Sequence, residues 1–454
     1  MAHPELSVDS KPTKESIELL QIMIQNACVN DGSIDSGHES RNAEVLTQVL
    51  EGPGLDIATF EPVPDRASVV AKIEGSDPEA PSLCFMGHTD VVPVSPSGWT
   101  HDPFGGELID GEIWGRGAVD MLNLTSSMAV AFRHLADTNF TPRGDLLFFG
   151  VADEEAGTGA GASWFVEHEP DAIRADYVLT ETGGLHLGSP GEPQLIMHVG
   201  EKGVEWRRLT VSGTPGHGSR PFRADNPLIK AAAVIQRLAE YRPTPTFHDQ
   251  WEAQARSFGL DDESTAALLD KGAIEEFLAD FPIPSLAAHF HACTHTTFSP
   301  NVIEAGEEQR PNVIPSEISI EVDIRSLPGE TLDDIDAHLR LALGELYDHV
   351  EIDATSSYEA TTSPIDTPLW GSLQRAVARP FPEAVIAPHL LVGFTDAHHY
   401  RKLGAVAYGA GLFSPELDPI SYSERFHGNN ERIDVASMAL STQFFIDVAR
   451  DFLT

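Results

Sequence analysis

Three adjacent carboxylates, Asp153-Glu154-Glu155, directly follow an apolar run over residues 146–152. A short apolar run bounded by turn residues is typical of a buried strand in a parallel sheet. In open α/β sheets, ligands bind beyond the carboxyl ends of such strands. Carboxylates held this closely repel one another unless a cation lies nearby. The stretch is therefore either a solvated acidic loop or one wall of a metal site.

Further side chains able to bind a metal follow other strand-like runs or lie in polar loops. They are His88, Asp90, Asp120, Glu181 and His427. The first two follow an apolar run over 82–87, and the glutamate follows a run over 177–180. The carboxyl ends of parallel strands meet at one edge of a sheet, so we expect these side chains to converge on one crevice.

This combination of two imidazoles and several carboxylates suits zinc, which keeps an open position for water in catalytic sites. If Asp120 bridged two zinc ions, the other ligands would form two pairs: His88 with Glu181, and Glu155 with His427. Three carboxylates and a bridging hydroxide would then offset the charge of the two ions. Asp90, two residues after His88, is placed to orient the imidazole.

The elements that must position these residues alternate along the chain. Helical spacing is visible over 14–27, 40–50 and 124–135, and strand-like runs lie over 68–73, 82–87, 146–152 and 177–180. Alternating strands and helices predict an α/β fold, with a mostly parallel sheet covered by helices on both faces. The same texture returns after residue 361 and ends in a helix that starts at Val435.

Between these parts the pattern changes. Residues 316–325 alternate apolar and polar side chains, as in a half-buried antiparallel strand, and amphipathic helices are predicted over 226–240 and 332–346. These elements indicate a small α+β unit. The predicted division is a discontinuous catalytic domain over 1–202 and 361–454 with an inserted α+β domain over 203–360.

The segment over 244–300 is an addition with one predicted helix over 264–281. It ends in a second candidate metal cluster, which consists of His289, His291 and His295. A His-x-His spacing places two imidazoles on one face of a strand. Because no carboxylate follows a strand end beside them, we interpret these histidines as structural.

Composition excludes some classes of partner. The chain has 454 residues, a formal net charge of −41 and three well-separated cysteines. Such a field repels nucleic acid and anionic membranes, so neither is expected to bind. The charge reflects either an acidic surface suited to high salt or attraction of a cationic substrate. Residues 1–5 contain no apolar signal core, and no apolar run approaches the roughly 20 residues of a membrane span, so we expect a cytoplasmic location with reduced thiols.

Several motifs together resemble the M20 metallopeptidase family. They are Gly87-His88-Thr89-Asp90-Val91-Val92, Trp114-Gly115-Arg116-Gly117-Ala118-Val119-Asp120-Met121, Asp153-Glu154-Glu155 and Phe426-His427-Gly428-Asn429-Asn430-Glu431. The stretch Trp99-Thr100-His101-Asp102-Pro103-Phe104 and the His427 motif look most similar to the branch of carboxypeptidase S and the N-fatty-acyl amino acid hydrolases. The resemblance covers nearly the whole chain.

The resemblance implies roles for the residues that match. The ligands of two zinc ions, with Asp120 bridging, would be His88, Asp120, Glu155, Glu181 and His427. Cobalt or manganese are possible substitutes for zinc. Glu154 matches the general acid/base, which takes a proton from metal-bound water and delivers it to the leaving amine.

The insertion matches the family's lid and dimerisation domain, which implies a homodimer. His217 in Gly216-His217-Gly218-Ser219 resembles the histidine that reaches a neighbouring subunit's site and stabilises the oxyanion. Asn312, Arg325 and Thr395 resemble residues that contact substrate, with the arginine clamping a carboxylate. Two positions beside the pocket depart from the family pattern: Leu122 replaces a common lysine, and His398 a common arginine.

We therefore expect a di-zinc hydrolase that cleaves the amide bond of an N-acyl amino acid or small peptide with a free carboxylate. The first hypothesis is an N-acyl amino acid deacylase. The alternative within the same chemistry is a dipeptidase or carboxypeptidase. A third hypothesis is a non-catalytic binding protein that retains the fold. The presence of Glu154 and of all five predicted metal ligands argues against it.

Overall fold

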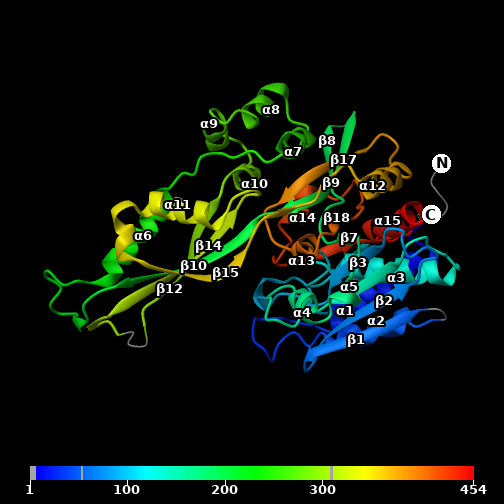
Figure 1. The fold of residues 1–454 in the computed structure, drawn as a ribbon, viewed down its shortest axis with the longest axis horizontal. Helices are drawn as coiled ribbons and strands as arrows, with labels where there is room; N and C mark the ends of the chain where they lie inside the picture. The colour runs from blue at the N-terminus through cyan, green and yellow to red at the C-terminus, as the bar shows by residue number, and fades with distance from the viewer. Residues whose placement is uncertain (1–6, 53–54, 190, 307–309) are drawn as a thin grey trace.

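The structure is a computed structural model that describes residues 7–52, 55–189, 191–306 and 310–454. The first five residues, which were predicted to form a polar start, lie outside the described residues. Two bodies are visible in Figure 1, one around a ten-stranded sheet and one around a four-stranded sheet. Among the described helices, none is long and apolar enough to cross a membrane.

The ten-stranded sheet has the order β1-β2-β6-β3-β7-β18-β9-β16, and β17 and β8 also pair with β9. Its strands are β1 (Asp56–Val63), β2 (Arg66–Ile73), β3 (Leu83–His88), β6 (Leu146–Val151), β7 (Tyr177–Thr180), β8 (His186–Ser189), β9 (Glu192–Glu201), β16 (Thr361–Thr362), β17 (Val385–Leu391) and β18 (Val406–Gly409). The central strands β6, β3, β7 and β18 run parallel, and antiparallel strands stand at the edges. The predicted α/β fold is confirmed.

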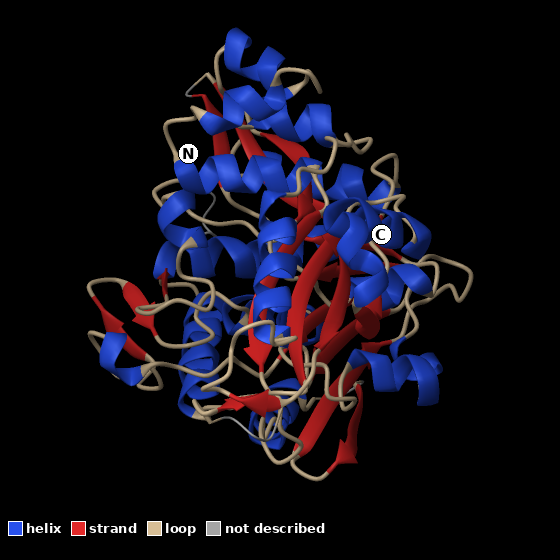
Figure 2. Ribbon diagram, turned by 90° about the vertical axis from the view of Figure 1, so that its left-hand side faces the viewer, coloured by secondary structure: helices blue, strands red, loops and turns tan. Residues whose placement is uncertain are grey.

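Helices cover both faces of this sheet, as Figure 2 shows. The helices of the larger layer are α1 (Lys11–Gln25), α2 (Ser40–Leu50), α3 (Leu122–Asp137), α12 (Pro368–Ala378) and α15 (Val435–Phe452). The other face is covered by α4 (Ala162–His168), α5 (Pro170–Ile173) and α13 (Ala397–Lys402). A separate apolar core lies on each face, so the strands are buried on both sides and read as continuous apolar runs.

The four-stranded sheet is antiparallel and has the order β12-β14-β10-β15. Its strands are β10 (Gly203–Ser212), β12 (Thr297–Glu304), β14 (Glu317–Ser326) and β15 (Glu351–Tyr358), and its helices are α6 (Pro227–Glu240) and α11 (Leu332–Leu343). Every second residue of β14 is buried, which confirms the predicted alternation. The apolar residues of this face pack against both helices and form a core of their own.

Small elements complete the described chain. They are η1 (Pro96–Gly98), β4 (Glu107–Ile109), β5 (Glu112–Trp114), β11 (Gly216–His217), β13 (Val313–Ile314), η2 (Gly344–His349), α14 (Pro419–Ser423) and β19 (Arg432–Asp434). Strands β4, β5 and β19 form a three-stranded sheet, and β11 pairs with β13. The β11–β13 ribbon belongs to the part of the chain that includes the four-stranded sheet.

The segment over 244–300 differs from its prediction. It consists of α7 (Trp251–Ser257), α8 (Asp262–Leu268), α9 (Ile274–Ala279) and α10 (Pro284–Thr294). The single helix predicted over 264–281 is wrong, because a turn at Asp270-Lys271-Gly272 separates α8 from α9. His289 and His291 lie on α10, so their His-x-His spacing does not align two imidazoles on one face of a strand.

This helical segment packs against the ten-stranded sheet through α7 and β17. Gln254 accepts a hydrogen bond from the backbone of Leu390 at 3.1 Å, and the Ser257 hydroxyl lies 2.7 Å from Nε2 of the buried His389. The helices share an apolar core that Val392 also contacts. The segment therefore connects the two bodies of the molecule.

Candidate metal centre

The predicted ligands meet at the carboxyl ends of the parallel strands. His88 is the last residue of β3, Asp153-Glu154-Glu155 follow β6, and Glu181 follows β7. These strands are neighbours in the sheet and run in the same direction, so their ends bring the side chains to one edge. We call this site the crevice.

Asp120 lies between two imidazoles. Its Oδ1 is 3.2 Å from Nε2 of His88, and its Oδ2 is 3.2 Å from Nε2 of His427. Asp120 stands just before α3, whereas His427 comes from the loop after α14 with a positive φ of 55°. One carboxylate thus faces a histidine on each side, which is the arrangement expected of a bridging ligand.

The remaining carboxylates divide between these two histidines. Oε2 of Glu181 and Oε2 of Glu154 each lie 4.0 Å from Nε2 of His88, and Oε2 of Glu155 lies 3.2 Å from Nε2 of His427. Two overlapping groups have donor atoms close enough to share an ion: His88 with Asp120 and Glu155, and His88 with Glu154 and Glu181. Glu154 therefore lies within reach of the same space as the predicted ligands.

The acidic groups of the crevice have more negative charge than the chain itself offsets. Burial, and then the charge of Asp120, raise the pKa of Glu155 and raise that of Glu181 well above its ordinary range. Oε1 of Glu155 is buried and accepts no hydrogen bond from the described residues. A site of this kind fits divalent cations, since imidazole and carboxylate are the ligands they take in catalytic centres.

The carboxylates raise the pKa of both histidines. Hydrogen bonds to Asp120 and Glu155 raise the pKa of His427 to about 10. Burial alone would lower the pKa of His88, but hydrogen bonds to Asp120 and Asp90 outweigh it and raise that pKa well above its usual value. A metal ion requires neutral imidazole, so its binding would replace these protons.

Asp90 holds His88 and the acidic stretch in a fixed relation. Nδ1 of His88 lies 3.0 Å from the backbone carbonyl oxygen of Asp90 and 3.5 Å from its Oδ1. The carboxylate of Asp90 also accepts hydrogen bonds from the backbone N–H groups of Glu154 at 3.2 Å and Glu155 at 3.1 Å. With Nδ1 donating to Asp90, Nε2 of His88 is left to face the crevice.

Behind this layer is a buried ion-pair network that sequence reasoning missed. Arg66 on β2 pairs with Glu39 and also donates from Nη2 to Oδ1 of Asp153 at 2.9 Å. Asn30 joins it by donating 2.9 Å to Asp90 and 3.0 Å to Asp153. These residues are far apart in the chain, and no local pattern marks them as partners.

A cavity of about 390 Å³ opens over the ligands and extends to the four-stranded sheet. Glu154 and Arg325 both line it, together with the aromatic residues Trp206, Tyr358, Phe394 and Phe426. Nε of Arg325 lies 2.8 Å from Oδ1 of Asp323, so its guanidinium already has a carboxylate partner within β14. The cavity combines acidic, cationic and apolar walls.

Thr395 and Asp396 also line this cavity. Thr395 lines the cavity, but its hydroxyl donates 2.7 Å to Glu201. Asp396, which sequence reasoning passed over, is buried, and its Oδ2 accepts no hydrogen bond from the described residues. Burial raises the pKa of Asp396 to about 8. The sequence signal was its place beside Thr395 in the loop that precedes α13.

The structure does not bring His217 and Asn312 to this cavity. Both are exposed and meet in the β11–β13 ribbon, where the N–H of Gly218 donates 2.7 Å to the carbonyl of Asn312. The hydroxyl of Ser219 lies 2.8 Å from Nδ1 of His217. Neither residue is among the described residues that line the crevice cavity.

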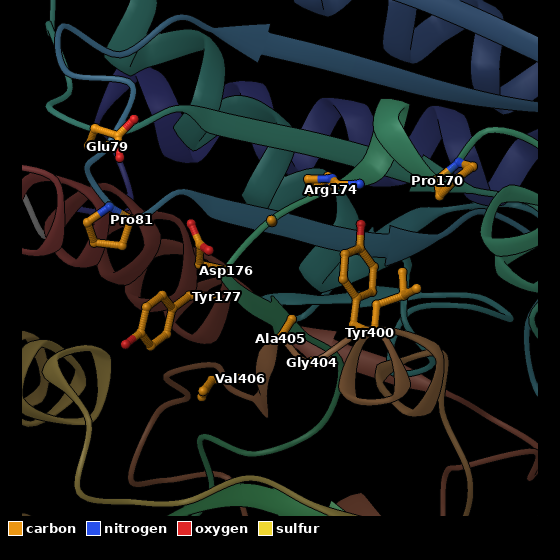
Figure 3. Close-up of a pocket in the computed structure, with 12 residues that line it drawn as sticks. Glu79, Pro81, Pro170, Arg174, Asp176, Tyr177, Tyr400, Gly404, Ala405 and Val406 are labelled. Carbon is orange, nitrogen blue, oxygen red and sulfur yellow. The ribbon is translucent and has the colours of Figure 1, made fainter.

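A larger cavity of about 600 Å³ lies at the opposite edge of the sheet (Figure 3). Its walls include Pro81 and Asp176, just before β3 and β7, and Val406 at the start of β18. Figure 3 shows Arg174 and Tyr177 around this space. It therefore opens at the amino ends of the strands whose carboxyl ends form the crevice, and the two cavities have no described lining residue in common.

The fold and the crevice define a class of protein, the metal-dependent hydrolases, in which strand-end imidazoles and carboxylates surround a buried glutamate. The sequence pattern described as "Peptidase family M20/M25/M40" matches residues 84–451. The chain belongs to this family, and its resemblance to M20 peptidases is thereby confirmed.

Proteins similar to this chain include both acylases and peptidases. An "N-fatty-acyl-amino acid synthase/hydrolase PM20D1" of Xenopus tropicalis is 29% identical over 393 residues, which is 84% of this chain and 74% of that protein. A "Probable carboxypeptidase S-like 2" of Dictyostelium discoideum is 26% identical over 400 residues, 85% of this chain and 74% of that protein.

Solved structures show the same fold. The M20 family metallo-carboxypeptidase Sso-CP2 of Sulfolobus solfataricus superimposes with a TM-score of 0.71 at 18% identity, over 98% of this chain and 99% of that one. The dipeptidase Dug1p of Saccharomyces cerevisiae also gives a TM-score of 0.71, at 15% identity, over 100% and 99% of the two chains.

Proposed function

We propose that the protein is a di-zinc amidohydrolase that removes the acyl group from an N-acyl amino acid. The observation that carries this proposal is the position of Asp120 between His88 and His427, with the carboxylate of Glu154 beside the same space. Such a site needs only a small amide substrate whose carbonyl can enter the cavity.

The proposed metal ligands fall into two sets. Asp120 would belong to both sets, with His88 and Glu181 in one set and Glu155 and His427 in the other. The orphaned Oε1 of Glu155 supports this assignment, because it has an unused lone pair in a buried position. Zinc suits these ligands, and cobalt or manganese could replace it.

When bound, the ions would polarise the substrate carbonyl and lower the pKa of a water molecule held beside it. Glu154 would accept the proton that this water loses as its oxygen bonds to the carbonyl carbon, and would deliver it to the amide nitrogen as the C–N bond breaks. Burial and the charge of Glu181 raise the pKa of Glu154 well above its ordinary range, which suits a group that must both accept and donate a proton near neutral pH. Asp90 keeps the imidazole of His88 in the tautomer that presents Nε2 to the crevice.

The substrate is proposed to lie along the cavity with its carboxylate at Arg325. That guanidinium would exchange its partner Asp323 for the substrate, since a planar fork binds a carboxylate through two hydrogen bonds. The aromatic walls at Trp206 and Phe394 suit an apolar acyl chain. The name of the Xenopus protein, an N-fatty-acyl-amino acid hydrolase, supports this choice.

His217 and Asn312 are proposed to serve the crevice of a second copy of the chain. They are exposed on the β11–β13 ribbon and away from the cavity of their own chain, which suits residues offered to a partner. This requires a homodimer in which the unit over 203–360 acts as lid and contact surface. The parts over 1–202 and 361–454 then form the catalytic domain. Thr395 would contact substrate with groups other than its hydroxyl and its backbone N–H, because both of these donate to Glu201.

A dipeptidase or carboxypeptidase is the alternative function. It uses the same ligands and the same Glu154, and the metallo-carboxypeptidase and dipeptidase with this fold favour it. The two functions differ in what fills the apolar end of the cavity, an acyl chain or an amino acid residue. The cytoplasmic location stays a prediction.

A substrate screen tests the proposal. The protein is freed of metal, reloaded with zinc, cobalt or manganese, and supplied with N-acyl amino acids of increasing chain length and with dipeptides. We expect faster release of amino acid from the acylated substrates. Faster cleavage of dipeptides would favour the alternative, and no hydrolysis of either by any metal form would contradict both.

Subunit mixing tests the role of His217. A Glu154→Gln chain and a His217→Ala chain are each expected to be inactive, and a mixture that exchanges subunits should regain activity. In the mixed dimer, one crevice combines an intact Glu154 with an intact His217 of the other copy. If the mixture regains no activity although the subunits are shown to exchange, His217 acts within its own chain.

A further inference from the structure

A second group of metal-binding side chains lies where α9 meets the end of α10, away from the crevice. It consists of Glu275, His291 and His295, and we call it the α9–α10 cluster. Their donor atoms all lie within 4.8 Å of one another. The sequence favours a structural role for these two histidines because no carboxylate is expected beside them, but Glu275 supplies that carboxylate. His291 and His295 are one helical turn apart, and their rings stack in parallel, with centroids 4.1 Å apart and an angle of 6° between the planes. Because the lone pair of an imidazole lies in the plane of its ring, one ring must turn out of this stack for both to bind the same ion.

His295 presents an unprotonated nitrogen to the cluster. Its Nδ1 lies 3.0 Å from the backbone carbonyl oxygen of His291, which can only accept. It also lies 3.0 Å from the hydroxyl of Thr294, but that hydroxyl donates to the carbonyl of Phe290, so the proton of the neutral ring is on Nδ1. Nε2 then carries a lone pair. It is buried and makes no hydrogen bond of proper geometry within the described residues.

That lone pair faces a carboxylate. Oε1 of Glu275 lies 2.7 Å from Nε2 of His295. Two acceptors at this distance repel each other unless a proton or a metal ion lies between or beside them.

The nearest ammonium is engaged elsewhere. Nζ of Lys202 donates 2.8 Å to the carbonyl of Ala292 and 2.6 Å to the carbonyl of His295. These contacts fix the backbone on which the two histidines stand. Lys202 is therefore hydrogen-bonded to carbonyl oxygens, and Glu275 faces the imidazoles.

The cluster opens to a cavity of about 450 Å³, which Glu275 and His291 both line. Tyr241, Arg242 and Phe298 form other walls of this space. An ion bound by three side chains would thus keep one coordination position open to solvent. Two imidazoles and one carboxylate with an open position are a ligand set that zinc and related divalent metals take.

We propose that Glu275, His291 and His295 form a further binding site for a divalent transition metal of the zinc class, separate from the crevice. The ion would join α9 to the end of α10, at the point where the helical segment passes into β12. The hydrogen bond from His295 Nδ1 to a carbonyl is the outer contact that commonly orients a metal-bound histidine.

Counting bound zinc tests this proposal without reference to activity. The full chain is stripped with a chelator, equilibrated with zinc chloride, freed of excess metal and analysed by mass spectrometry. Glu275→Gln and His291→Ala are each expected to bind one equivalent per chain less than the wild type. Glu276→Gln is the matched control, because it removes the same charge from the next, exposed residue, and it should bind as the wild type does.

A second pair of variants separates this site from the crevice. Asp120→Asn with Glu155→Gln should abolish crevice binding and leave one equivalent, and addition of Glu275→Gln should remove that one as well. The difference between the last two proteins does not depend on how many ions the crevice holds. Zinc should also raise the Tm of the first of them and leave that of the second unchanged.

Equal zinc content in the wild type, Glu275→Gln and His291→Ala would overturn the proposal. It would mean that a proton, and not a metal ion, joins Glu275 to His295. Loss of one equivalent in the Glu276→Gln control would also overturn it, because the effect would then follow surface charge. If only the proposed metal site of the crevice were wrong, the wild type would still bind one equivalent of zinc, and Glu275→Gln would remove it.

Discussion

The crevice and the α9–α10 cluster both combine imidazole with carboxylate, but the chain builds them in different ways. In the crevice, His88, Asp120 and Glu181 come from separate strands and loops, and their positions follow from the order of the sheet. In the cluster, two histidines one turn apart share a helix end, and only Glu275 comes from another element. One site is a product of the fold, and the other is nearly local.

The two sites also differ in how firmly the surrounding residues hold their metal-binding side chains. Asp90 receives hydrogen bonds from the backbone of Glu154 and Glu155, and it contacts His88 through its own backbone carbonyl. The side chain of Glu275 is 46% exposed, whereas that of His295 is fully buried. The crevice is therefore held in shape before any ion arrives, while the cluster must order a surface carboxylate on binding. We expect the crevice to bind metal more tightly.

The largest effect should come from Glu154→Gln. Loss of the group that transfers the proton should lower kcat by about 10²–10⁴-fold, while the zinc content stays at the wild-type level. Steady-state rates and metal analysis of the same sample measure both quantities. Glu275→Gln, the corresponding change in the other cluster, should keep full activity. A Glu154→Gln protein as active as the wild type would refute the proposed mechanism.

The buried ion pair behind the crevice should matter next. Arg66→Met leaves Glu39 and Asp153 buried without their counter-charge, which should cost about 3–5 kcal/mol of unfolding free energy. Glu275→Gln should cost about 0–1 kcal/mol, because the side chain of Glu275 is itself half exposed. Urea denaturation in the presence of a chelator compares the two. Equal costs would mean that the crevice is no more preorganised than the cluster.

A smaller effect is expected from Asp90→Asn. The change weakens the contact that orients His88, so zinc affinity in the crevice should fall about 10–100-fold. The affinity of the α9–α10 cluster should not move, since Asp90 does not contact it. Competition for zinc with a chelator of known affinity resolves the two kinds of site. Unchanged crevice affinity would show that the backbone carbonyl of Asp90 orients the imidazole alone.

The sequence predicted the crevice well because its residues follow strands that are apolar on both faces. An apolar run marks the strand, the parallel order places its end, and the polar residues just after it are the candidates, as with His88 and Glu181. The assignment of ligand roles to these residues is still a proposal. The strands β1 and β9 were not predicted: β1 shows no dense apolar run, and the short apolar run Leu195-Ile196-Met197 of β9 was overlooked.

Features that depend on distant contacts could not be predicted. The network of Arg66, Glu39 and Asp153 joins three parts of the chain. The hydroxyl of Thr395 donates to Glu201, which is far away in the sequence. Local signals misled in the helical segment. A His-x-His spacing fits a strand, but Pro284 begins a helix there and brings His291 over His295 instead.

The last prediction, whose effect is small for any single pH unit, concerns Lys202, which contacts the backbone at the end of α10. Its neighbour Glu201 binds Thr395 and Arg401 beside the crevice, whereas Lys202 itself binds the carbonyls of Ala292 and His295. Burial lowers the pKa of Lys202 to about 7, from an ordinary value of 10.5. Between these values the unfolded chain holds a proton that the folded chain has released.

The folded protein should therefore gain stability as the pH rises from 7 towards 10, by at most about 1.4 kcal/mol for each pH unit. Below pH 7 both states are protonated and this contribution is constant. In Lys202→Met the slope disappears, so the difference in unfolding free energy between the wild type and the variant should grow with pH. Urea denaturation with chelator at several pH values measures that difference. Parallel profiles would mean that Lys202 keeps its charge when buried, and that its carbonyl partners stabilise an ammonium next to His295 at all of these pH values.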